Sequence, residues 1–156
     1  MYKEEWVEVY ELEEKGLYKE ALTKVKVLFA DAVEQKAYAQ VIKTVLFELK
    51  YNSHLTEDNY VLGISRIEAL ISETPSPAKE ILHYVLAEAY LGYHSSNFWD
   101  LADRTDIEND DSTDIRTWGR MRLVGKFREH YLAALNNSEV SQKQAITDFS
   151  AVSYTH

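Results

Sequence analysis

The chain of 156 residues contains no cysteine. This absence excludes disulfides, thiolate metal sites and a cysteine nucleophile. Only two prolines and five glycines interrupt it, whereas alanine, leucine, glutamate and lysine are abundant, and that composition favours helices. No run of about 18 apolar residues occurs, so the sequence predicts no insertion into a membrane. The first residues, Met1 to Trp6, lack the apolar core of a signal peptide, so the signal of an exported parent protein would lie outside this sequence.

Basic residues are also in the minority. The chain carries 17 Lys and Arg against 26 Asp and Glu, which gives a formal net charge of −9 at pH 7. Binding to phosphates requires clustered cations, so the charge argues against nucleic acid as a partner. It argues equally against an anionic membrane surface. Because acidity also keeps a domain soluble, the charge alone identifies no partner.

Helical periodicity dominates what is present. Apolar residues recur with helical spacing in six segments, which are 4–15, 17–35, 37–51, 57–73, 77–95 and 114–136. The stripe expected to be buried in the third segment is Tyr38, Val41, Ile42, Val45, Leu46 and Leu49. In the fourth segment it is Tyr60, Ile64, Ile67 and Ile71. In the last segment it is Trp118, Met121, Val124, Phe127, Tyr131 and Leu135. No alternation of period two lasts long enough to predict a strand.

A tight turn at Lys15-Gly16-Leu17-Tyr18 joins the first two segments. Gly16 can adopt a positive φ and so end the first helix. The form Gly16-x-Tyr18-x-x-Ala21 resembles the turn of a tetratricopeptide repeat. Only the first hairpin shows this turn, and no strict 34-residue repeat is visible.

The fold predicted from these segments is all-α, with about six helices. Short polar turns favour antiparallel hairpins, stacked as a degenerate, tetratricopeptide-like, right-handed α-solenoid. We expect residues 1–137 to form this helical-repeat domain. Residues 138–156 would be a C-terminal arm or the start of a link to following domains, because the chain stops without a closing cap.

The acidic segment 103–114 is the best metal candidate. Its Asp106-x-Glu108-x-Asp110 alternation is that of a calcium loop, but Asp111 stands where the sharp-turn glycine belongs and Thr117 where the bidentate glutamate belongs. The segment is therefore interpreted as a solvated acidic loop. His83 and His94 lie roughly 16 Å apart along one predicted helix, too far to share a metal.

No motif for catalysis is present. Gly63-Ile64-Ser65-Arg66-Ile67 lacks the second glycine of a nucleophile elbow and lies within a helical pattern. No His-Glu-x-x-His motif and no glycine-rich phosphate loop occur. The sequence therefore predicts a non-enzymatic protein without cofactor or metal.

Aromatic side chains are the remaining candidates for a contact surface. Tyr84, Tyr90 and Tyr93 share one predicted helix, where they either pack in the core or line a groove. Trp99 stands beside the acidic segment. It either anchors that segment onto the helices or belongs to a contact surface.

A series of short motifs runs in order along nearly the whole chain. They are Trp6-x-x-Val9, Lys15-Gly16-Leu17-x-x-x-Ala21-Leu22, Ala39-Gln40-Val41-Ile42-Lys43, Glu57-Asp58, Pro77-Ala78-Lys79-x-Ile81-Leu82-His83, Leu86-Ala87-Glu88-x-Tyr90, Asn97-Phe98-Trp99, Arg104-Thr105, Asp114-Ile115-Arg116-Thr117-Trp118, Tyr131-x-x-x-Leu135 and Asp148-Phe149. Together they resemble the N-terminal helical region of bacterial alpha-2-macroglobulin family proteins of the Bacteroidetes type. The run from Asp114 to Trp118 is the most specific of them.

The resemblance implies a large, exported parent protein, built mostly of β-sandwich domains, in the periplasm or at the cell surface. Similar macroglobulins trap proteases with a bait region and a thioester, whose cysteine this chain lacks, so no functional residue is carried over. The implied role is a non-catalytic module that docks onto other domains of its parent or onto another envelope protein. The alternative is a free-standing, tetratricopeptide-like adaptor that binds a peptide or a protein.

The run from Asp114 to Trp118 also has a physical interpretation. Asp114 is expected to cap the helix 114–136, while Ile115 and Trp118 point inward together. Arg116 is placed to pair with acids of the preceding loop, and Arg104 lies within that loop. The residues with a candidate role in contact or in loop anchoring are Trp99, Arg104, Arg116, Trp118, Tyr84, Tyr90 and Tyr93.

Overall fold

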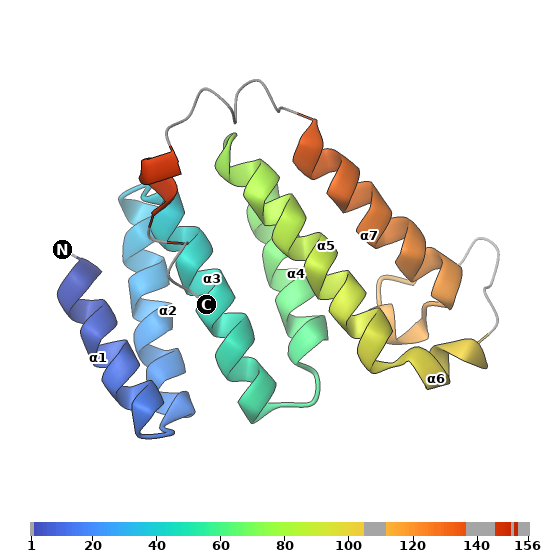
Figure 1. Ribbon diagram of the computed structural model, residues 1–156, viewed down its shortest axis with the longest axis horizontal. Helices are drawn as coiled ribbons and strands as arrows, with labels where there is room; N and C mark the ends of the chain where they lie inside the picture. The colour runs from blue at the N-terminus through green and yellow to red at the C-terminus, as the bar shows by residue number, and fades with distance from the viewer. Residues whose placement is uncertain (1, 105–111, 137–145, 151, 153–156) are drawn as a thin grey trace. The chain divides into compact units, whose positions relative to one another are not determined.

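A computed structural model describes residues 2–104, 112–136, 146–150 and 152. It contains seven α-helices, α1 (Tyr2–Glu14), α2 (Tyr18–Glu34), α3 (Tyr38–Leu55), α4 (Asn59–Ile71), α5 (Ala78–Ser96), α6 (Phe98–Ala102) and α7 (Arg120–Leu135), and two 3₁₀ turns, η1 (Ile115–Thr117) and η2 (Ile146–Phe149) (Figure 1). The described residues include no strand, so the predicted all-helical class is confirmed. None of the described helices is long and apolar enough to cross a membrane.

The chain divides into two compact units. The first unit holds α1, α2, α3 and η2, and the second holds α4, α5, α6, η1 and α7. The predicted domain boundary between 137 and 138 lies outside the described residues, as does 105–111, which is most of the acidic segment.

In the first unit, α1 packs against α2 and α2 against α3. These are the neighbours expected for helices joined by short turns. One apolar cluster holds the three helices together, and its buried members are Trp6, Val9, Ala21, Leu22, Val25, Leu28, Phe47 and Tyr51. Phe47 and Tyr51 were absent from the stripe predicted for α3. Leu46 and Leu49, which were in that stripe, are only partly buried.

The two turns of the first unit have the same backbone geometry. In the first, Gly16 N donates to Glu13 O and Leu17 N donates to Leu12 O. In the second, Lys36 N donates to Val33 O and Ala37 N donates to Ala32 O. This is the Schellman pattern, in which the residue after the helix adopts a left-handed conformation.

The prediction that only the first hairpin carries this turn is therefore wrong. Gly16 has a φ of 70° and Lys36, twenty positions later, has a φ of 54°. Each turn is followed two positions later by a tyrosine, Tyr18 or Tyr38. The repeat escaped detection because lysine occupies the position at which glycine is the usual signal.

In the second unit, the ring of Tyr60 from α4 reaches α5 at Gly92. A Cβ at this position would lie 2.6 Å from the Tyr60 ring, so a glycine inside α5 leaves room for that aromatic side chain. The short helix α6 follows α5 directly, after Asn97. α5 packs against both α6 and α7.

The predicted helix 114–136 is corrected by the structure. Ile115–Thr117 forms a separate 3₁₀ turn, Trp118 and Gly119 are extended, and α7 begins at Arg120. The predicted buried stripe of this helix is also partly wrong, because Met121 and Leu135 are exposed, while Leu123 and His130 are buried. Likewise, Leu70 rather than Ile71 completes the buried face of α4. Apolar residues occur on more than one face of α7, so periodicity alone selected the wrong face.

Candidate functional site

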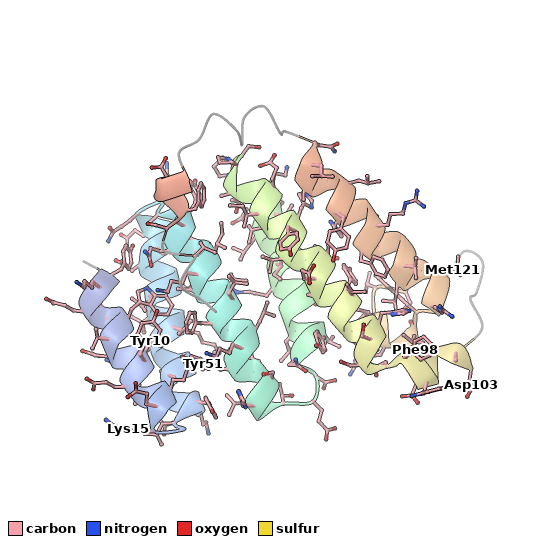
Figure 2. All side chains as sticks on the ribbon, in the orientation of Figure 1. Tyr10, Lys15, Tyr51, Phe98, Asp103 and Met121 are labelled. Atoms are coloured by element: carbon pink, nitrogen blue, oxygen red, sulfur yellow. The ribbon has the colours of Figure 1, made fainter. Side chains whose placement is uncertain are left out.

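The second unit exposes two adjacent aromatic side chains on α6. Trp99 is 82% exposed and Phe98 is 40% exposed. Their rings lie edge to face, with centroids 5.4 Å apart. The guanidinium carbon of Arg120 lies 5.5 Å from the centroid of the Phe98 ring, within the range of a cation–π contact. We call Phe98, Trp99 and Arg120 the aromatic corner; Figure 2 labels Phe98 on α6.

The backbone beneath the aromatic corner is well anchored. Asn97 ends α5 with its side-chain amide, whose Nδ2 donates to Tyr93 O at 2.9 Å. Leu101, on the opposite face of α6, is 1% exposed. Since α6 is one short helix held at both points, Trp99 presents its indole from a fixed position. Of the two predicted roles for Trp99, its exposure does not fit anchoring.

Arg104 joins the end of α6 to the turn η1. Its Nη1 donates to Arg116 O at 2.7 Å and to Trp118 O at 3.5 Å. These carbonyls belong to residues that follow the segment 105–111, so a single guanidinium holds the two described ends of the connection together. The loop-anchoring side chain is thus Arg104 rather than Trp99.

Arg116 forms a fork with Asp114. Its Nε donates to Asp114 Oδ1 at 2.9 Å, and its Nη2 donates to Asp114 Oδ2 at 2.9 Å. The backbone N–H of Arg116 donates to the same carboxylate at 3.0 Å, so Asp114 caps η1 and not a long helix. Hydrogen bonds from the Arg116 side chain and backbone lower the pKa of Asp114. The carboxylate is thus that of the capping residue itself, while the predicted pairing of Arg116 with the acids at 105–111 lies outside the described residues and stays a prediction.

Trp118 is a core residue and is 6% exposed. Its Nε1 donates to Ser112 O at 2.8 Å, and Arg122 Nη2 donates to the same oxygen at 2.8 Å. The Arg122 guanidinium carbon lies 4.0 Å from the Trp118 ring centroid. Trp118 and Arg122 therefore fix the segment that leads into α7.

Tyr90 is fully buried and belongs to a stacked aromatic column. Its ring is nearly parallel to Trp118 at 6.0 Å and to His130 at 5.8 Å. Its hydroxyl donates to Glu68 Oε1 at 2.7 Å, which links α5 to α4. Burial, and then the hydrogen bond to Glu68, raise the pKa of Tyr90.

The other two tyrosines of α5 differ in their exposure to solvent. Tyr93 is 6% exposed and meets Tyr60 edge to face at 6.4 Å. Tyr84 is 52% exposed, and its ring lies 6.1 Å from that of Tyr131. Tyr90 and Tyr93 thus serve the core, while Tyr84 remains accessible.

A histidine pair joins α5 to α7. Nδ1 of His83 lies 2.9 Å from Nδ1 of His130, so one ring donates to the other through a single shared proton. His130 is 9% exposed and its Nε2 makes no hydrogen bond. Desolvation lowers the pKa of both rings, so both are held neutral near pH 7.

Sequence reasoning compared His83 with His94 along one helix and missed His130, its actual partner 47 residues away. The available signal was the helical spacing of His130, which stands three residues after Phe127 and seven after Leu123 and so shares a face of α7 with them. Among the described residues, no group of three or more His, Cys, Asp or Glu side chains is arranged to hold a metal ion.

The first unit has its own polar cluster. The Lys43 ammonium lies 4.1 Å from the Trp6 ring centroid and 5.4 Å from that of Tyr10. Tyr51, fully buried, donates to Glu13 Oε2 at 2.8 Å, and Lys50 pairs with the same carboxylate. Figure 2 labels Tyr10 on α1 and Tyr51 on α3. The cations and the carboxylate of this cluster are engaged within the unit, so it is a structural feature.

Searches of family models, of curated proteins and of solved structures find no match to this chain.

Proposed function

We propose that this chain is a non-catalytic docking module that binds another protein through the aromatic corner. The observation that carries the proposal is the 82% exposure of Trp99 on a short, anchored helix. A tryptophan side chain buries roughly 150–250 Å² when it enters a pocket. At about 25 cal/mol per Å², filling such a pocket stabilises a complex by several kcal/mol.

The composition of the aromatic corner is that of an interface hot spot. Tryptophan and arginine are enriched among residues that dominate binding energy, and aromatic side chains are enriched in interface cores. Phe98 extends the apolar area beside Trp99, and Arg120 supplies a positive charge at its edge. The partner that fits is a protein with an apolar pocket for the indole and a carboxylate within reach of Arg120.

The resemblance to alpha-2-macroglobulin family proteins supplies the context of this proposal. In that context the chain is the helical N-terminal region of a large, exported protein, located in the periplasm or at the cell surface. The partner is then another domain of the parent or another envelope protein. Determining whether the reading frame continues beyond His156 into a long, β-rich chain tests this context. A stop codon at that point would contradict it.

A second candidate is a free-standing, tetratricopeptide-like adaptor. It is favoured by the repeated Schellman turn, with Gly16 and Lys36 at equivalent positions. Such an adaptor would bind through its helix faces in the first unit rather than through the aromatic corner.

One binding experiment separates the two candidates. The protein is immobilised and exposed to envelope extract, each retained protein is purified, and its affinity is measured against Trp99→Ala and against Val27→Ala. Val27, on α2, is 65% exposed and lies outside the aromatic corner. A docking partner should lose about 30-fold or more in affinity with Trp99→Ala, the cost of a hot-spot truncation, and little with Val27→Ala. Equal affinity for wild type and Trp99→Ala would reject the aromatic corner as the docking site.

A further inference from the structure

Helix α7 is held differently before and after Gly125. Its buried side chains are Leu123 and His130, so beyond Gly125 the described residues of this helix include one buried side chain, that of His130. Before Gly125, α7 is held by Leu123, which is fully buried, and by Arg122, whose Nη2 donates to Ser112 O at 2.8 Å. The attachment of the later part of α7 therefore depends largely on His130.

This later part, residues 126–135, is called the α7 end segment. It lies along α5, the helix against which α7 packs (Figure 1). Two polar contacts join it to α5: Nδ1 of His130 lies 2.9 Å from Nδ1 of His83, and the Tyr131 hydroxyl donates to Glu88 Oε1 at 2.6 Å. The contact to Glu88 is exposed, so water competes for both of its partners. Of these two polar contacts, the histidine pair is the one that burial protects from water.

The histidine pair fits its neutral form and not its charged forms. Two neutral imidazoles carry two protons on four ring nitrogens, and one proton is shared between the Nδ1 atoms. When His130 carries the shared proton, its Nε2 holds no hydrogen. A third proton, with the shared bond kept, puts a hydrogen on this Nε2, which is buried and has no hydrogen-bond partner. A fourth proton puts a hydrogen on both Nδ1 atoms, so the bond is lost and the two cations repel.

Charged groups face the pair from three helices. They are Lys79 and Glu80 of α5, Lys126 and Glu129 of α7 and Glu68 of α4. Each of the three carboxylates is bonded to another group: Glu80 accepts from Ser76 Oγ at 2.7 Å. Glu129 pairs with Lys126 at 3.1 Å, and Glu68 accepts from the Tyr90 hydroxyl. Burial outweighs these charges and lowers the pKa of both rings, in agreement with the proton count.

The α7 end segment has little helical stability of its own. Gly125 precedes it, in the middle of α7, where glycine is less favourable than alanine. A Cβ at Gly125 would meet nothing within 4 Å, whereas the glycine at position 92 makes room for Tyr60. The last turn of α7 carries no base to offset the helix dipole. The segment is also shorter than the roughly 12–15 residues below which an isolated helix is marginal in water. Its helical structure therefore depends on its contact with α5.

We propose that acid releases the α7 end segment: when His83 and His130 take up protons, residues 126–135 leave α5 and lose their helical structure, with Gly125 as the boundary. In the released segment the histidines have their ordinary pKa of about 6.5, so release grows as the pH falls below that value. Each histidine that takes up a proton on release raises the released population by up to about tenfold per pH unit.

The release uncovers one part of the second unit and leaves another in place. His130 stacks on the Tyr90 ring at 5.8 Å, so its departure exposes this buried tyrosine. Residues 120–124 stay, because Leu123 and Arg122 hold them. Arg120 of the aromatic corner is among the residues that stay, so the inference does not depend on docking through Trp99.

Native-state amide exchange of the whole chain between pH 7 and 5, corrected for the intrinsic effect of pH on exchange, tests the proposal. Protection at 126–135 should fall below about pH 6.5, by up to about tenfold per pH unit for each histidine. Low concentrations of urea separate release from unfolding. Release of a short segment exposes little surface, so protection at 126–135 should depend weakly on urea, whereas protection at 59–71 of α4 should depend steeply. Leu123, whose N–H donates to Gly119 O, should follow α4.

Four variants connect the release to the histidine pair and to Gly125. His83→Asn, at a partly exposed position, leaves one histidine of the pair, so the pH dependence at 126–135 should shrink from up to about a hundredfold to up to about tenfold per pH unit. Adding His130→Asn should abolish it. His54→Asn, at an exposed position in the first unit, should keep the wild-type response. Gly125→Ala should raise protection at 126–135 several-fold at every pH, because the added methyl group meets nothing and alanine favours the helix.

Two results would overturn the proposal. The first is a urea dependence at 126–135 as steep as that of α4 at pH 5, which would mean that α7 opens only when its unit unfolds. The second is a pH dependence at 126–135 that His83→Asn leaves unchanged. This second measurement needs only the variant at the partly exposed position, so it remains decisive if the double variant fails to fold.

Discussion

Each unit contains one fully buried tyrosine whose hydroxyl donates to a glutamate on another helix, but the surroundings differ. Tyr51 donates to Glu13, which also forms an ion pair with Lys50. Tyr90 donates to Glu68, and its ring stacks on His130 of the neutral histidine pair. In the first unit the partly buried carboxylate is also paired with a cation, whereas in the second unit the accepting Glu68 is exposed and the tyrosine ring stacks on a neutral histidine.

The two units also differ in the kinds of apolar side chain that they expose. Among the residues that the structure describes in the first unit, the large exposed apolar side chains are aliphatic, namely Val7, Leu17, Val27, Val33 and Leu55. Those of the second unit include Phe98, Trp99 and Met121. This contrast teaches that the histidine pair and the aromatic corner proposed for binding both lie in the second unit.

The largest expected effect comes from removing the two tyrosines. Tyr51→Ala and Tyr90→Ala should each lower the free energy of unfolding by about 3–5 kcal/mol, because a large aromatic side chain leaves a cavity. Amide hydrogen exchange should show lost protection in α1 to α3 for Tyr51→Ala and in α4, α5 and α7 for Tyr90→Ala. Equal loss in both units from either variant would show that they unfold as one, and so would remove the basis of the comparison.

The second effect is pH-dependent and should be confined to the second unit. Unfolded histidines protonate near their ordinary pKa of 6.5, whereas desolvation lowers the pKa of folded His83 and His130. The unfolded chain therefore binds more protons below about pH 6.5, and stability should fall with pH at up to about 1.4 kcal/mol per pH unit per histidine. The charged groups around the pair are Lys79 and Glu80 of α5, Lys126 and Glu129 of α7 and Glu68 of α4.

The first unit should respond only at lower pH. Burial acts to raise the pKa of Glu13, but hydrogen bonds from Lys50 and Tyr51 outweigh it, so the pKa lies below the ordinary 4.5. The stabilisation by Glu13 is present above pH 4.5 and is lost as pH falls through the lowered pKa.

Urea unfolding at pH 7, 6 and 5 measures how stability depends on pH and so checks the predicted role of the histidine pair. His130→Asn should flatten the response between pH 7 and 5, while His54→Asn, an exposed histidine of the first unit, should retain it. A His130→Asn response as steep as that of wild type would contradict the role of the pair.

The third effect concerns the connection at η1. Arg104→Met keeps most of the aliphatic stem but removes the donors to Arg116 O and Trp118 O. Because hydrogen bonds from a charged donor contribute about 1.5–3 kcal/mol, and Arg104 is partly exposed, a loss of about 1–2 kcal/mol is expected. Amides at 115–119 should exchange faster, and Arg66→Met, on α4, should leave them unchanged. Unaltered exchange at η1 would show that Arg104 does not hold the connection.

The smallest effect distinguishes the two matching turns of the first unit. Gly16→Ala should destabilise by about 1 kcal/mol, because a side chain is strained at a φ of 70°. Lys36→Gly should stabilise by up to about 1 kcal/mol, since it relieves the same strain at a φ of 54°. Thermal unfolding of both variants measures the two changes in stability. Shifts of the same sign would contradict the equivalence of the turns.

The sequence predicted the helical class and most helix positions, because a 3.6-residue period and scarce glycine and proline act over a few residues. It also predicted the turn at Gly16, where glycine signals the required backbone conformation. It missed the equivalent turn at Lys36, because there a residue other than glycine adopts the same left-handed conformation, closed by the same pair of backbone hydrogen bonds. At the candidate site, the sequence selected Trp99, Arg104 and Arg116. It left open whether Trp99 was buried or exposed.

What only the tertiary structure decided are the relations between distant residues. The approach of His83 to His130, the stack of Tyr90 on Trp118, and the choice of which face of α7 is buried all depend on helices that are far apart in sequence. Local periodicity predicts that a helix has an apolar face, but when two faces are apolar it cannot choose between them. Packing against α5 made that choice, because Leu123 and His130 fit there, and so left Met121, Leu132 and Leu135 exposed.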